Sequence, residues 1–283
     1  MDAAHVPDDW AALAEDLAGS EWRRLVVLGA TDRGKSTLIR VLASRLARQG
    51  AELSLLDCDL GQKAAGPPGC VTLADWRGGF ALTALYFVGT TNPVGVMPAV
   101  VTGTARLAAR ASRRLLVNTS GLVDGPGLAL KRWKLDVLDP DRIVLLAQPG
   151  ELPGLTALIP PRRLLRLTPS PEARRKGQGR RERARRASFQ AALAGAPEQV
   201  LAPTAVERMT RDAPFPEDLR LVGLADAFGE DVGVGLARWP AEGEPWRVRT
   251  FVDPARVWRL RIGMALPAET EFPGPGWSND GAR

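Results

Sequence analysis

The chain has 283 residues, of which 45% are hydrophobic and 25% charged, so it is long enough for one large globular domain with a smaller one appended. No apolar run approaches the length of a membrane span, about 18 residues, and residues 1–20 lack the features of a secretory signal, so we expect a cytoplasmic protein without a membrane partner. Two cysteines and one histidine exclude a disulfide framework and a histidine-based metal site or catalytic triad.

The first part of the chain alternates between strand-like and helix-like patterns. A short amphipathic helix at residues 8–17 precedes a strand at 25–28, and a helix follows at 35–48. Further strands are predicted at 52–56, 85–88, 114–117 and 142–147, and further helices at 97–112 and 127–137. This alternation predicts an α/β fold with a mostly parallel sheet flanked by helices.

The segment between the first strand and the second helix fits the phosphate-binding P-loop. Two glycines stand five positions apart, followed by a lysine and a hydroxyl residue, so that backbone N–H groups can turn inward around phosphates at a helix N-terminus. The predicted nucleotide-binding residues are Gly29, Ala30, Thr31, Asp32, Arg33, Gly34, Lys35, Ser36 and Thr37. A glycine turn without a ligand is the alternative, but the flanking strand and helix favour a P-loop NTPase.

Two carboxylates follow the second predicted strand. Asp57 and Asp59 come at its C-terminal end, where open α/β sheets bind ligands, and alternate positions of an extended chain face the same side. One can bind Mg²⁺, together with the P-loop Ser36, while the other accepts a proton from an attacking hydroxyl, as phosphoryl transfer requires. A solvated strand end or a cap is the plainer alternative.

Basic charge is concentrated at residues 162–186, where ten arginines and one lysine face two glutamates, a local net charge of +9. Since the whole chain carries +6, the remainder is near −3. Such a patch suits a polyanionic ligand, although a run of charge is also typical of a solvated helix face. Only five of the 38 basic residues are lysines, a bias that a GC-rich genome alone can produce.

The pattern changes near residue 203, where turn-rich stretches begin to separate short strand candidates. These strands are predicted at 219–225, 232–237, 246–252 and 257–262. We therefore expect a small C-terminal β domain at 204–266, after a P-loop domain at 21–200 with an arginine-rich lid at 170–190. A helical segment at 1–20 and a tail at 267–283 complete the predicted organisation.

Four segments resemble, in the same order, the Clp-type polynucleotide 5′-hydroxyl kinases. They are the P-loop at 31–37, the carboxylate segment at 57–62 with the Gly-Pro-Pro-Gly turn at 66–69, the segment at 87–93, and Asn-Thr-Ser-Gly at 118–121. Eukaryotic members of this family serve tRNA splicing, mRNA 3′-end formation and ribosomal RNA processing. The resemblance covers residues 25–189, and more weakly the segment after 219.

The resemblance implies a role for individual positions on the donor side. Lys35 and Ser36 would hold ATP and Mg²⁺, and Asp32 fills the family's acidic position inside the loop. Asp59 would be the Walker B carboxylate that activates the substrate 5′-hydroxyl, with Gln62 beside the reacting end.

The resemblance also implies a clasp and a lid around the substrate. The clasp grips the terminal nucleotide, and its substrate-binding residues here would be Thr119, Ser120, Gly121 and Leu122. The arginine-rich segment would be the lid, whose arginines stabilise charge on the transferring phosphoryl group. Alignment selects Arg181 and Arg185, one helical turn apart, as the catalytic lid pair.

Two positions depart from the family pattern. The clasp is often followed by a tryptophan that stacks on a base, where this chain has Leu122; stacking contributes about 1–3 kcal/mol, so we expect a weaker grip on the substrate end. After Pro93 the family commonly has a basic residue and a histidine, where this chain has Val94, Gly95 and Val96.

Together these features predict an ATP-dependent, Mg²⁺-dependent kinase that transfers the γ-phosphate of ATP to the 5′-hydroxyl end of RNA, DNA or both. One alternative is a scaffold protein that binds ATP without turning it over inside a nucleic-acid-processing complex. A GTPase or another P-loop small-molecule kinase is the other. A GTPase normally carries Asn-Lys-x-Asp after a later strand, where this chain has Gln148 and Pro149.

Overall fold

The computed structural model describes residues 5–111, 114–173, 177–209 and 218–266, so the tail predicted at 267–283 lies outside the described residues. The chain divides into two compact units, Met1–Arg181 and Glu182–Arg283. It passes from one to the other inside helix α6 (Gln178–Leu193). The division therefore falls within the arginine-rich segment, ahead of the change in sequence pattern near residue 203.

The first unit is built on a seven-stranded sheet with the order β4-β3-β2-β5-β1-β6-β7. Five strands run parallel: β1 (Arg24–Leu28), β2 (Leu53–Cys58), β5 (Arg114–Thr119), β6 (Arg142–Leu146) and β7 (Leu164–Leu167). At one edge, β3 (Cys70–Trp76) and β4 (Phe80–Phe87) form an antiparallel hairpin. The mostly parallel sheet is confirmed, whereas β3, β7 and the start of β4 were not predicted from the sequence.

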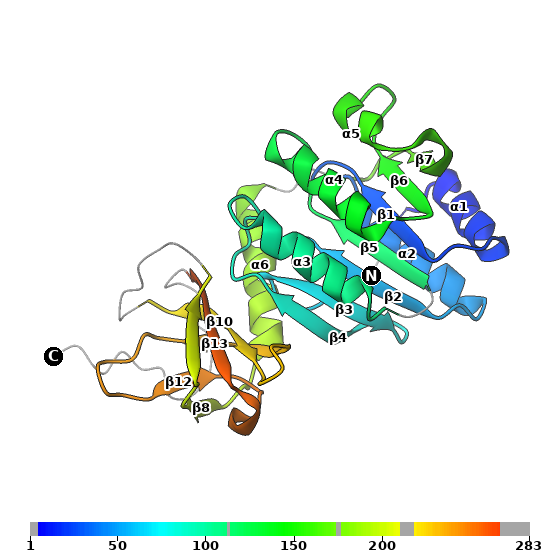
Figure 1. The fold of residues 1–283 in the computed structure, drawn as a ribbon. Helices are drawn as coiled ribbons and strands as arrows, with labels where there is room; N and C mark the ends of the chain where they lie inside the picture. The colour runs from blue at the N-terminus through cyan, green and yellow to red at the C-terminus, as the bar shows by residue number, and fades with distance from the viewer. Residues whose placement is uncertain (1–4, 112–113, 174–176, 210–217, 267–283) are drawn as a thin grey trace. The chain divides into compact units, whose positions relative to one another are not determined.

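Helices cover both faces of this sheet (Figure 1). The core that contains the buried side chains of α1 (Asp8–Gly19) and α2 (Lys35–Arg48) takes Leu25 and Val27 from β1. The core on the opposite face takes Val26 and Leu28 from the same strand, together with side chains of three further helices. These are α3 (Met97–Ala108), α4 (Pro126–Leu138) and α5 (Pro153–Leu158). Alternation along β1 thus supplies both cores, as a sheet buried on both faces requires.

The second unit is a six-stranded sheet with the order β8-β12-β11-β10-β13-β9, which confirms the predicted C-terminal β domain. Its strands are β8 (Glu198–Leu201), β9 (Ala205–Arg208), β10 (Arg220–Ala225), β11 (Asp231–Ala237), β12 (Trp246–Arg249) and β13 (Arg259–Ala265). Side chains such as Leu224, Val248 and Leu260 form its core. The sequence analysis missed the short strands β8 and β9, which lie at the two edges of the sheet.

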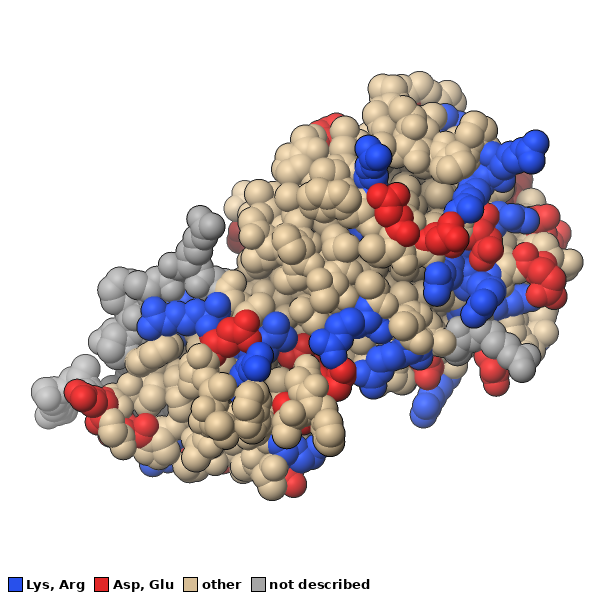
Figure 2. All heavy atoms as spheres, in the orientation of Figure 1, with Lys and Arg blue, Asp and Glu red and all other residues tan. Residues whose placement is uncertain are grey.

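The surface mixes charges of both signs. On the face in view in Figure 2, Lys and Arg side chains are interspersed with Asp and Glu, and much of the area over α3 carries neither. Within the described residues, no helix is long and apolar enough to cross a membrane.

Candidate active site

The P-loop joins the end of β1 to the start of α2, and close packing explains both of its glycines. A Cβ at Gly29 would lie 2.6 Å from the carbonyl oxygen of Leu146 in β6. Gly34, which precedes α2, has φ +92°, and a Cβ there would lie 3.2 Å from the ring of Trp10. Asp32, inside the loop, also has a positive φ, +62°, which is uncommon for a residue with a side chain. The loop is therefore held in one tight conformation.

Lys35 is buried at the first position of α2, with 7% of its surface exposed. Its Nζ donates a hydrogen bond to the carbonyl oxygen of Ala30, 2.8 Å away, across the loop. Burial lowers the pKa of Lys35, and the opposite charges of Asp59, Asp32 and Asp57 counteract part of that effect. The ammonium group is thus surrounded by carboxylates at the mouth of the loop.

A cavity of about 380 Å³ lies over the P-loop and joins most of the predicted site residues. It is lined by Thr31, Asp32, Gly34, Lys35, Ser36, Thr37, Asp59, Gln62, Asn118, Gly121, Glu172, Ala173 and Arg180. The loop, the turn after β2, the end of β5 and the start of the arginine-rich segment therefore meet around one hollow. This is the sheet edge at which open α/β folds bind ligands.

Asp57 and Asp59 occupy different environments. Asp57, the fifth residue of β2, is fully buried; it accepts hydrogen bonds from Asn118 Nδ2 (2.9 Å) and the backbone N of Ala64 (2.6 Å), and lies 3.7 Å from Lys63 Nζ. Asp59 lies just beyond the strand and lines the cavity. Of these two carboxylates, only Asp59 lines the cavity that Lys35 and Ser36 also line.

Asp59 also shapes its own turn. Its Oδ1 accepts hydrogen bonds from the backbone N of Gly61 (2.9 Å) and of Gln62 (3.0 Å). No helix begins here, so these bonds form a local turn and not a helix cap, and the same side chain lines the cavity. Gln62 in turn donates from Nε2 to the carbonyl oxygen of Arg181, 3.2 Å away.

The predicted clasp follows β5 and packs directly on the P-loop. Thr119 is fully buried and donates to the carbonyl oxygen of Val27 in β1 (2.8 Å), so it anchors the strand end. Gly121 lines the cavity, and a Cβ there would lie 2.1 Å from Thr31 Oγ1 and 2.5 Å from its backbone N. Ser120 is 8% exposed, and Leu122 is half-buried outside the cavity lining.

The arginine-rich segment reaches the P-loop through the first residues of α6. Arg181 lies with its guanidinium 3.4 Å from Asp32 Oδ2, and Arg180 lines the cavity. Arg185 belongs to the second unit, so the pairing of Arg181 with Arg185 stays a prediction. Residues 174–176 of the predicted lid lie outside the described residues.

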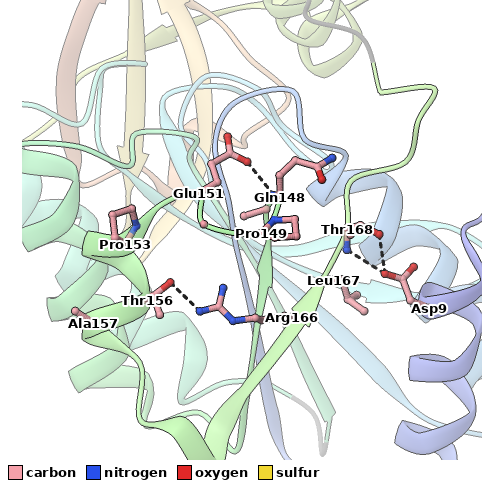
Figure 3. Close-up of a pocket in the computed structure, with 12 residues that line it drawn as sticks. Asp9, Gln148, Pro149, Glu151, Pro153, Thr156, Ala157, Arg166, Leu167 and Thr168 are labelled. Atoms are coloured by element: carbon pink, nitrogen blue, oxygen red, sulfur yellow. Dashed lines mark hydrogen bonds between the residues drawn. The ribbon is translucent and has the colours of Figure 1, made fainter.

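A second cavity, of about 530 Å³, opens where β6 and β7 end (Figure 3). Its polar groups include Gln148 and Glu151 after β6, Thr168 after β7 and Asp9 of α1. Asp9 Oδ2 accepts hydrogen bonds from both the backbone N and Oγ1 of Thr168, each at 3.0 Å. Glu151 also forms an ion pair with the P-loop residue Arg33, so this cavity borders the donor loop.

The site contains buried lysines that the sequence analysis did not select. Lys63, Lys131 and Lys134 have almost no exposed side-chain surface, and all three donate to backbone carbonyls of the strand ends or clasp. The scarcity of lysine was a usable signal, because four of the five lysines of the chain lie at this site. The interpretation from sequence explains the scarcity of lysine by genome composition alone.

Comparison with protein families gives a match over more than half of the chain. The model of the family described as "mRNA cleavage and polyadenylation factor CLP1 P-loop" matches residues 29–193. The matched stretch begins at the first P-loop glycine and ends at the last residue of α6.

Two curated relatives are named polyribonucleotide 5′-hydroxyl-kinases. The chain is 37% identical over 166 residues to a polyribonucleotide 5′-hydroxyl-kinase of Thermococcus kodakarensis, and 36% identical over 157 residues to one of Pyrococcus horikoshii. These matches cover 55% and 52% of this chain and 47% and 44% of the relatives, so the chain spans about half the length of the curated relatives it matches.

A solved structure shares the fold. The Clp1p structure in a complex of wild-type Clp1p with Pcf11p superposes with a TM-score of 0.74 over 92% of this chain and 79% of that one, at 12% identity. At this identity the likeness concerns the fold alone. It agrees with the P-loop α/β unit and the C-terminal β unit described above.

Proposed function

Because the chain belongs to the CLP1 P-loop family, we propose that it is an ATP-dependent polynucleotide kinase that phosphorylates the 5′-hydroxyl end of RNA, DNA or both. The observation that carries this proposal is the shared cavity, in which Lys35 and Ser36 face Asp59 and Gly121. Groups that hold a phosphate donor and groups that activate and grip an acceptor thus line one space.

The donor side fits a nucleoside triphosphate. The P-loop backbone and Lys35 would hold the phosphates at the N-terminus of α2, where the helix dipole and free N–H groups favour negative charge. The second cavity would take the base and ribose, since it borders the loop and carries Gln148, Thr168 and Asp9 as polar groups. These three polar groups would then determine the specificity for ATP.

The residues of the cavity also fit a magnesium ion bound to the phosphates. Ser36 would supply an oxygen ligand beside Lys35, and Asn118 Oδ1 is buried at the same cavity with no protein hydrogen-bond partner. When bound, Mg²⁺ would neutralise charge on the transferring phosphate.

On the acceptor side, Asp59 would be the proton acceptor. Its Oδ1 is engaged by its own turn, which fixes the carboxylate and leaves Oδ2 available to take the proton of the 5′-hydroxyl. Gly121 would allow the terminal nucleotide to approach the P-loop closely, and Gln62, which also lines the cavity, would contact it; Ser120 is not among the lining residues. Asp57 would act by holding Asn118 and Lys63 in place, rather than on the metal.

Arg181 is the lid residue that the geometry favours. It pairs with Asp32 inside the P-loop, so a small rearrangement would bring its guanidinium to the phosphates that the same loop holds. There it would stabilise the charge that develops during transfer. Arg185 would complete the lid.

We also expect the protein to act in the cytoplasm.

The test is direct labelling. Incubation with γ-labelled ATP, Mg²⁺ and a 5′-hydroxyl oligonucleotide, as RNA and as DNA, should place label on the 5′ end. ATP binding without label on any RNA or DNA length would contradict the kinase proposal and favour an ATP-binding scaffold. Labelling of free nucleosides only would favour a small-molecule kinase instead.

A further inference from the structure

The lysines at the site stand out against an arginine-rich chain. Five of the 38 basic residues are lysines, so 33 are arginines, and four of the five lysines lie around the candidate site. Lys35, Lys131 and Lys134 are 7%, 0% and 1% exposed, and the Lys63 side chain is 1% exposed. The exposed basic side chains of the described residues therefore belong to arginine. Lysine occurs here where a compact, buried ammonium group is needed.

We propose that Lys131 and Lys134 of α4 are positioning residues, which hold the clasp and the Asp59 turn at the distance that transfer requires. The proposal rests on the kinase function proposed above. Neither side chain reaches solvent, so neither is assigned a direct contact with substrate. Each would act through the loop that it holds.

Lys131 fixes the clasp. Its Nζ donates to the carbonyl oxygen of Ser120 at 2.7 Å and contacts Ser120 Oγ at 3.1 Å. Ser120 directly precedes Gly121, which packs against Thr31 of the P-loop. Loss of the Lys131 contacts would therefore free the segment that sets how closely an acceptor approaches the donor loop.

Lys134 fixes the carboxylate turn from the same face of α4. Its Nζ donates to the carbonyl oxygen of Cys58 at 3.3 Å, immediately before Asp59. Residues three apart on a helix lie on one face, so a single rigid element spans both loops. Lys63 acts similarly on the other side of the strand end, donating to the carbonyl oxygens of Asp57 (2.8 Å) and Cys70 (3.1 Å).

Burial of these two ammonium groups costs free energy, so their presence needs an explanation. Burial lowers the pKa of both Lys131 and Lys134, and their mutual repulsion adds to the lowering for Lys131. No carboxylate lies within ion-pair distance of either in the described parts of the chain. Apolar side chains of similar length would fill the same space without that penalty, so packing alone does not account for two lysines here.

The two lysines hold different loops, which gives a kinetic signature. In Lys131→Met the released clasp should raise KM for a 5′-hydroxyl oligonucleotide about tenfold, with kcat within about threefold of the wild type. In Lys134→Met the displaced Asp59 turn should lower kcat about tenfold, with both KM values within about threefold. The KM for ATP should stay within about threefold in each variant.

Arg132→Met is the matched control, because it removes a positive charge from an exposed position of the same helix. It should leave all constants within about twofold of the wild type. Melting curves verify that each variant is folded. Lys131→Gln and Lys134→Gln replace any methionine variant that fails to fold, and they are judged by the same criteria.

Loss of kcat and of acceptor affinity in equal measure in both variants, or wild-type constants in either, would overturn the proposal. A wild-type chain that labels nothing would contradict the kinase function instead. Binding of a fluorescent 5′-hydroxyl oligonucleotide in the presence of ATP then decides about the lysines. Weakening of about tenfold by Lys131→Met but not by Lys134→Met supports the proposal, and equal binding or none overturns it.

Discussion

The two sides of the cavity are built in different ways. The phosphate-binding part of the donor side, the P-loop, is a single continuous segment, and backbone shape and close packing at Gly29 and Gly34 hold it. The acceptor side combines the ends of β2 and β5, and buried side chains join them, as in the hydrogen bond from Asn118 to Asp57. The P-loop motif can therefore be recognised in one local stretch of sequence, whereas the acceptor side is assembled from segments that lie far apart in the chain.

This difference means that substitutions should act differently on the two sides. Changes on the acceptor side should alter turnover or acceptor affinity while nucleotide binding persists. Changes where the two sides touch, at Gly121 and Thr31, should affect both.

Asp59→Asn should give the largest loss on the acceptor side. The amide keeps an oxygen for the turn but cannot take a proton, so we expect the labelling rate to fall by about 10²–10⁴-fold. ATP affinity, measured by calorimetry, should change little because the P-loop is intact. Asp57→Asn is the comparison: it leaves Lys63 without a charged partner and should lower the melting temperature. Wild-type turnover in Asp59→Asn would assign the proton acceptor to another residue.

Gly121→Ala tests the contact between the two sides. The added methyl group would lie 2.5 Å from the backbone of Thr31, so either the clasp or the P-loop must move. We expect a loss of about 10–100-fold in kcat/KM, with weaker binding of ATP as well as of the oligonucleotide. Gly125→Ala is the control. A Cβ there meets nothing within 4 Å, but its φ is +51°, so this variant measures the effect of backbone strain without a steric clash. Unchanged ATP affinity in Gly121→Ala would show that the two sides are independent.

Arg181→Ala should have a smaller effect, mainly on turnover. Removal of a charge that stabilises the transferring phosphate is expected to lower kcat about tenfold, with ATP affinity nearly unchanged. Arg183→Ala, two positions along α6, should lower kcat less. Equal losses in the two variants would show that the lid register is wrong.

The pH dependence of stability should report the buried ammonium of Lys131. Its pKa in the folded chain lies well below 10.5, chiefly through burial and then through the charges of Lys134 and Lys35, partly offset by Asp59 and Cys58. At pH values between the folded and unfolded pKa, the unfolded chain binds one more proton, so this residue makes stability rise with pH up to the unfolded pKa. The melting temperature of the wild type relative to Lys131→Met should therefore increase as the pH rises from the lowered folded pKa toward 10.5, the ordinary value. A constant difference would contradict the lowered pKa.

The sequence predicted features that depend on local pattern. The helix at 35–48 is found with both ends as expected, because the P-loop begins it and its apolar face is regular. The fold class and the CLP1 family are confirmed, since strands alternating with helices and four ordered motifs specify them. Strand β3 was not predicted from the sequence. It follows β2 after a turn and pairs with it antiparallel, whereas strict alternation of strands and helices would place a helix after β2.

Features that depend on contacts between distant residues were not predicted. The sequence predicts that Asp57 and Asp59 share one site. In the structure, Asn118 and Lys63 contact the buried Asp57, whereas Asp59 lines the cavity. The roles of Lys131 and Lys134 follow from partners 11 and 76 positions away in the chain. The assigned functions of the site residues remain predictions that the experiments above test.

Two oligonucleotides of one sequence, ending in a 5′-hydroxyl or a 5′-phosphate, distinguish a cavity shared by donor and acceptor from a cavity that only binds ATP. With γ-labelled ATP and Mg²⁺, the wild type should label the first and not the second. Asp59→Asn should bind ATP and label neither. Equal labelling of both ends, or of neither by the wild type, would contradict a cavity built for phosphoryl transfer to a 5′-hydroxyl.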